Sequence, residues 1–156
     1  MIAVAILLAG LHYLALGIGM GSVFMRGRFL RAVRAGHVEA RTLKGLFGAD
    51  SLWGVAALLW LVTGLGRLFG GIEKQTDFYL RNGFFWMKMG LFVTILLLEI
   101  WPMITFIRWR IAQKGEAPLP GLERIGGLIL LNDLEVACLA LIPFVAAAMA
   151  RGVWLF

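Results

Sequence analysis

The chain has 156 residues, of which 61% are hydrophobic and only 15% are charged. A soluble domain is about half apolar, so this composition argues against a soluble enzyme and predicts a protein whose surplus apolar side chains face lipid. The formal net charge is +6, and most of the basic residues lie beside the apolar runs. Attraction to anionic lipid headgroups explains this arrangement more simply than binding to nucleic acid does.

Four apolar runs follow one another along the chain, at about residues 2–25, 46–66, 84–107 and 125–150. Each has the roughly 20 residues that a helix needs to cross a hydrocarbon core of about 30 Å. Because these runs fill most of the chain, we predict a single transmembrane domain over residues 1–156. The predicted fold is all-α, an integral membrane four-helix bundle with the N-terminus and the C-terminus outside.

The predicted orientation comes from the basic residues between the runs. The connectors after the first and third runs hold ten arginines and lysines, whereas the middle connector and the C-terminal segment hold four. Basic connectors tend to stay in the cytoplasm, so the two richer connectors are predicted to face it and to contact anionic lipid headgroups.

The first connector also predicts local structure. Phe29 and Val33 recur at helical spacing among arginines, which is typical of a helix that continues from the first run to about Gly36. At the start of the second run, Asp50 or Ser51 is predicted to cap the helix, because such residues are preferred at N-caps.

The third run contains two ionisable residues, Lys88 and Glu99. Their spacing places them on one face of a helix but about three turns apart, so they cannot form a salt bridge. If Arg26, Arg108 and Arg124 mark the cytoplasmic surface, Glu99 lies ~13 Å deep and Lys88 lies near the outer boundary. An ionisable group at the depth of Glu99 indicates a functional site. Lys88 either extends to the outer headgroups or meets the acidic group of a ligand.

The fourth run carries three polar residues, Asn132, Asp133 and Glu135. Asn132 and Glu135 share one stripe of a helix, whereas Asp133 points ~100° away from Asn132. We therefore expect Asp133 and Glu135 to contact different neighbours. Glu99, Asp133 and Glu135, with His12, are candidates for a proton relay or a polar cluster.

His12 lies on a stripe of small residues that includes Ala9, Ala15 and Gly19, so we expect it to face the bundle interior. One interpretation is a neutral imidazole that is hydrogen-bonded across helices, to Glu135 or to a backbone carbonyl. The other interpretations are a haem or metal ligand and a proton-transfer site. No metal-ligand spacing is present, so we predict no metal site.

Several motifs resemble those of known membrane families. The segments GLHYLALGIGMG, RGRFL, FWMKMG and LILLNDLEV resemble the HemJ-type protoporphyrinogen oxidases, and CopD-like membrane proteins share the general pattern. The segments LFGADSLWGVAALLW and NGFFWMKMGLF are similar to a bacterial family of predicted four-span membrane proteins. Where the HemJ family has a histidine, eleven residues after Lys88, this chain has Glu99.

The resemblance implies a multi-pass protein of the bacterial inner membrane that binds haem b. It implies a catalytic role for Lys88 and cofactor-binding roles for His12, Arg28 and Asn132. Glu99 is the other candidate catalytic residue, because of its depth in the third run. Three functions remain open at this point: a HemJ-related haem, porphyrin or redox function, an accessory or assembly subunit of a larger membrane complex, and a proton or ion relay. Homo-oligomers and membrane-complex partners are both left open.

Overall fold

The structure, a computed structural model, describes residues 2–71 and 75–154 as a chain of helices. Four of these helices are long and apolar enough to cross a membrane, which confirms the predicted all-α four-helix bundle. In chain order the elements are α1 (Ile2–Arg34), α2 (Ala40–Phe69), α3 (Thr76–Leu80), α4 (Gly83–Lys114), the 3-10 turn η1 (Leu122–Arg124) and α5 (Ile125–Ala150).

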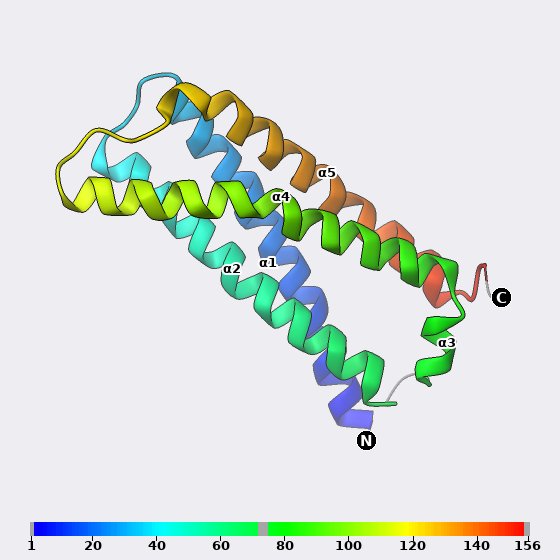
Figure 1. Cartoon of the computed structure of the whole chain (residues 1–156). Helices are drawn as coiled ribbons and strands as arrows, with labels where there is room; N and C mark the ends of the chain where they lie inside the picture. Colours follow the sequence, from blue (N-terminus) through cyan, green and yellow to red (C-terminus); the bar gives the residue numbers. More distant parts are fainter. Residues whose placement is uncertain (1, 72–74, 155–156) are drawn as a thin grey trace.

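The four long helices run up and down, so that successive connectors lie at opposite ends of the bundle (Figure 1). Helix α1 packs against both α2 and α5, and α4 packs against α5. The α1–α2 and α4–α5 connectors lie at one end, which we call the basic end. Helix α3 and both chain ends lie at the other, which we call the terminal end (Figure 1).

The boundaries of three helices differ from the predicted spans, and α4 is one of them, because it runs to Lys114, beyond residue 107. Helix α1 continues to Arg34 and is followed by Gly36 at a φ of +96°, as the pattern of the first connector predicts. Helix α2 already begins at Ala40, so Asp50 and Ser51 lie within it, and the prediction that one of them caps the helix is wrong. The helix starts early because residues before the apolar run have a buried face of their own, which packs against the core.

Small residues allow α1 and α2 to approach closely, as predicted for the stripe that contains His12. A Cβ on Gly19 would lie 2.8 Å from the Trp53 ring, so only glycine fits at this contact. Large apolar side chains on all four long helices point outward instead; examples are Ile2, Leu58, Leu97 and Phe144. An outward apolar surface of this extent is suited to a lipid bilayer.

Candidate functional site

Arg26 on α1 is the centre of an ion-pair network. Its side chain is 0% exposed, and its Nε donates to Oδ1 of Asn132 at 2.9 Å. Its Nη1 donates to both carboxylate oxygens of Glu99 at 2.8 Å, and its Nη2 donates to Glu135. Asp50 lies 3.5 Å from Nη1. One guanidinium thus joins α1 to α2, α4 and α5, and we call these five residues the ionic cluster.

Asp50 connects the ionic cluster to a second guanidinium, that of Arg110 on α4. Nη2 of Arg110 donates to Oδ2 of Asp50 at 2.7 Å, and also to the Ser51 hydroxyl and the Phe47 carbonyl at 3.1 Å. Asp50 therefore helps to hold α2 against α4, besides facing Arg26.

Arg26 is the residue that the sequence analysis missed, because it was taken to mark the cytoplasmic surface. Arg26 contacts Glu99, which lies nine residues before Arg108 on α4, so Arg26 lies deeper in the bundle than Arg108. The signal that could have identified Arg26 is the presence of carboxylates in two other apolar runs, because buried carboxylates need a cation at their own depth.

Asp133 does not belong to the ionic cluster. It accepts two hydrogen bonds of 2.7 Å from Nη2 of Arg31, and both side chains are about half exposed. Asp133 and Glu135 therefore address different neighbours, as predicted, and Asn132 and Glu135 share the face of α5 that meets Arg26.

His12 lies in a second polar site, nearer the terminal end. The indole N–H of Trp60 donates to Nε2 of His12 at 3.0 Å, so Nε2 must be an acceptor. Nδ1 lies 2.9 Å from the Thr63 hydroxyl, which itself donates to the Leu59 carbonyl at 2.7 Å. A neutral imidazole protonated on Nδ1 satisfies all of these contacts. The interpretation of a neutral histidine bonded across helices fits this arrangement, with Trp60 and Thr63 of α2 as its side-chain partners.

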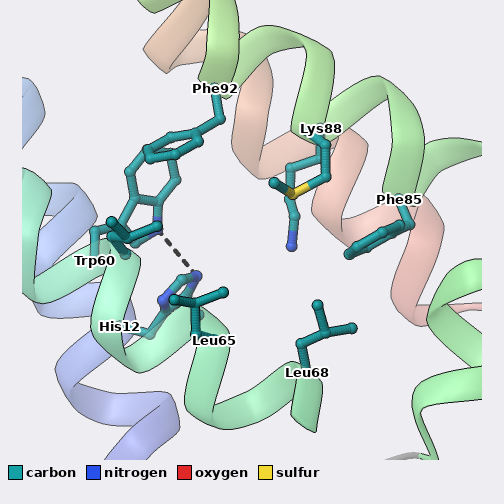
Figure 2. Close-up of a pocket in the computed structure, with 10 residues that line it drawn as sticks. His12, Trp60, Leu65, Leu68, Phe85, Lys88 and Phe92 are labelled. Atoms are coloured by element: carbon teal, nitrogen blue, oxygen red, sulfur yellow. Dashed lines mark hydrogen bonds between the residues drawn. The ribbon is translucent and has the colours of Figure 1, made fainter. Parts of the chain in front are cut away.

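Two adjoining cavities of about 70 and 270 Å³ open beside His12, and we call them together the terminal cavity. Both are lined by His12, Trp60, Gly64, Leu68, Phe85 and Lys88. Figure 2 shows Lys88 extending from α4 into the space between Phe85 and His12. The Lys88 Nζ lies 5.7 Å from the centre of the Phe85 ring. Lys88 thus points into a cavity. The sequence left two roles open for this residue, an extension to the outer headgroups and a contact with the acidic group of a ligand.

The structure separates the predicted site residues into two groups. Glu99, Asn132 and Glu135 are in the ionic cluster, whereas His12 and Lys88 line the terminal cavity. Along α1, His12 and Arg26 are ~21 Å apart by helical rise. Arg28, predicted from the resemblance to bind a cofactor, is exposed and contributes to neither site.

Comparisons with known proteins identify a family. The family model described as "Predicted membrane protein (DUF2214)" matches residues 4–154. No curated protein and no solved structure matches the chain. The likeness to HemJ-type oxidases therefore remains one of short motifs, and the chemistry of the two sites has to be argued from their geometry.

Proposed function

Since the chain belongs to the DUF2214 family of predicted membrane proteins, we propose a function that takes place within the bilayer. The terminal cavity binds an amphiphile, with Lys88 holding its acidic group and aromatic and aliphatic side chains holding its apolar part. The acidic group is a carboxylate or a phosphate, since both accept charge-assisted hydrogen bonds from an ammonium.

The observation that carries this proposal is the position of the Lys88 ammonium. It points into the terminal cavity, and among residues 2–71 and 75–154 no aspartate or glutamate lines that cavity. An ammonium removed from water is costly unless an anion accompanies it. A ligand that brings an acidic group into the cavity would remove this cost, which is a direct reason for it to bind.

The rest of the lining suits the apolar part of such a molecule. Phe85 and Phe92 extend from α4, and Trp60, Leu65 and Leu68 face them from α2 (Figure 2). Ligand sites in proteins are mostly apolar with a few polar groups that fix orientation, and Lys88 with His12 would be those groups here. Arg67 also lines the larger cavity and adds positive potential that favours an anion.

The haem function implied by the resemblance is less well supported by the same site. Nε2 of His12 already accepts from Trp60, so iron ligation would require that hydrogen bond to break. The carboxylate groups of a porphyrin nevertheless belong to the proposed ligand class. A relay from the ionic cluster to His12 would have to cross ~21 Å. An accessory subunit of a larger complex would need no ligand at Lys88. The following binding experiment therefore distinguishes that function from the proposed one.

The test is a binding measurement on the full chain in nanodiscs of zwitterionic lipid. The probes are a fluorescent long-chain fatty acid, its methyl ester and the matching alkyl phosphate, each measured above empty nanodiscs. We expect the acids to bind and the ester to bind at least tenfold more weakly. Lys88→Gln should weaken acid binding about 10-fold to 100-fold, since a hydrogen bond to a charged group contributes about 1.5–3 kcal/mol.

The matched control is Lys114→Gln, in the last turn of the same helix at the basic end, which should leave binding unchanged. Equal binding of acid and ester, or equal binding by the Lys88→Gln variant and the unmodified protein, would reject the proposal. The preference between fatty acid and alkyl phosphate identifies the acidic group.

A further inference from the structure

The ionic cluster and Arg110 together contain one more acidic group than basic groups. Asp50, Glu99 and Glu135 are the three acids, and Arg26 and Arg110 are the two guanidinium groups bound to them. If every group were ionised, the site would carry one uncompensated negative charge inside the membrane. An uncompensated charge at this depth is expensive, so a proton or a cation would be expected to balance it.

The three acids differ in their exposure at the surface of the bundle. The side chains of Asp50 and Glu99 are 14% and 17% exposed, whereas that of Glu135 is 0% exposed. Oε2 of Glu135 binds Arg26, but Oε1 is buried and has no hydrogen-bond partner among the residues that the structure describes. A buried carboxylate oxygen without a partner is strongly disfavoured, and a proton on that oxygen removes the charge.

We propose that the ionic cluster is a proton-binding site in which Glu135 holds one exchangeable proton on Oε1 at neutral pH. This site is separate from the terminal cavity and does not depend on the ligand proposed there. The charged groups that face Glu135 are Arg26 from α1 and Glu99 from α4, with Asp50 of α2 beyond Arg26. Arg26 is the positive group of this set, and Glu99 and Asp50 are the negative ones.

Glu99 provides the route of exchange. It binds Nη1 of Arg26 while Glu135 binds Nη2, so the two carboxyl groups are neighbours on one guanidinium, and only Glu99 reaches the surface. On release, the O–H bond of the Glu135 carboxyl breaks, its electron pair stays on the carboxylate, and the proton leaves past Glu99. The charge of the cluster with Arg110 then changes from zero to minus one, while the Glu135 carboxylate remains paired with Arg26.

The test is infrared spectroscopy of the full chain in nanodiscs, in heavy water, as a function of pH. At neutral pH exposed carboxyl groups are ionised, so a protonated-carboxyl stretching band reports a buried acid. We expect that band in the unmodified protein, its loss at high pH, and its absence in Glu135→Gln. The control Glu123→Gln changes an exposed acid of η1 and should leave the band intact. Absence of the band from the unmodified protein overturns the proposal.

The melting temperatures of two variants test which of the two acids holds the proton. Gln has nearly the shape of a protonated Glu, so Glu135→Gln should melt within about 2 °C of the unmodified protein. Glu99→Gln removes the ionised partner that accepts both hydrogen bonds from Nη1, and should melt about 5 °C lower. A band that persists in Glu135→Gln, or a larger loss for Glu135→Gln than for Glu99→Gln, contradicts the assignment to Glu135.

Discussion

Arg26 places a guanidinium group inside the bundle, where a cation has no access to water. Its burial is tolerated because donors on Nε, Nη1 and Nη2 are matched by acceptors from α4 and α5, and the Phe106 ring lies 5.8 Å from the guanidinium carbon. The fork of an arginine can address several acceptors in one plane, whereas a lysine concentrates its donors at a single nitrogen. The residue therefore specifies how three helices are aligned, beyond supplying a positive charge.

Replacement of Arg26 should be among the most damaging single changes in the chain. Arg26→Gln leaves the Glu99 carboxylate without its cation and removes the donor to Glu135, and removal of one partner from a buried ion pair costs about 3–5 kcal/mol. Arg26→Lys should recover less than half of that loss, because one ammonium cannot reach Asn132 and both carboxylates. The free energy of unfolding in a fixed detergent and lipid mixture is the quantity to measure.

The control for Arg26 is its near neighbour Arg28, which carries the same charge but is exposed. Arg28→Gln should change the free energy of unfolding by less than about 0.5 kcal/mol, as is usual for surface substitutions. Equal effects at the two positions would show that the positive charge of the basic end, and not the buried network, stabilises the bundle.

At the level of the helices, the sequence predicted their number and approximate extent because lipid imposes a length and a composition on each span. The end of the last apolar run predicted the end of α5 at residue 150, and the helical spacing of apolar residues in the first connector predicted the extension of α1 beyond residue 25. The early start of α2 did not follow, because the apolar run was taken as the whole helix. Arg26 contacts Glu99, so it cannot mark the same membrane surface as Arg108, which lies nine residues after Glu99 on α4.

The partners of the polar residues were harder to predict than their presence. The sequence placed Asn132 and Glu135 on one stripe, which the structure bears out, since their relation depends only on helical periodicity. The bonds from His12 to Trp60 and Thr63 depend on how α1 is rotated and shifted against α2. No feature within either helix fixes that register, so the sequence left the partner of His12 open.

Gly27 controls how closely α1 and α5 approach. A Cβ at this position would lie 2.5 Å from Nδ2 of Asn132, which is too close for any real contact. Gly27→Ala should therefore displace the Asn132 amide from Arg26 and reduce stability by about 1–3 kcal/mol, the cost of overpacking a well-packed core. Unfolding of the variant in the same lipid and detergent measures this loss.

Gly21 is the matched control on the same helix, because a Cβ there would meet nothing within 4 Å. Gly21→Ala should be neutral or slightly stabilising, since alanine is favoured over glycine within helices by about 1 kcal/mol. A stable Gly27→Ala variant would mean that Asn132 moves at little cost, and that its bond to Arg26 contributes little to the packing of α5.

At the level of the whole molecule, the two sites divide the bundle along its length. The ionic cluster joins all four long helices in the half nearer the basic end, whereas the terminal cavity lies in the half nearer the chain ends. A bundle fixed at one end and hollow at the other can admit a ligand without losing the alignment of its helices. The side of the membrane that the cavity faces is therefore the property that decides which ligands reach it.

The charge asymmetry predicts that the cavity opens toward the outside, and cysteine labelling tests this orientation. In a Cys138→Ala background, Gln75→Cys places one thiol beside α3, and Ala117→Cys places one in the α4–α5 connector. A membrane-impermeant maleimide added to intact cells should label residue 75 and leave residue 117 unlabelled, because the basic connectors stay inside. Both thiols should react after the membrane is permeabilised, which controls for burial. Labelling of residue 117 alone in intact cells would invert the topology, so the terminal cavity would then draw its acidic ligand from the cytoplasmic leaflet.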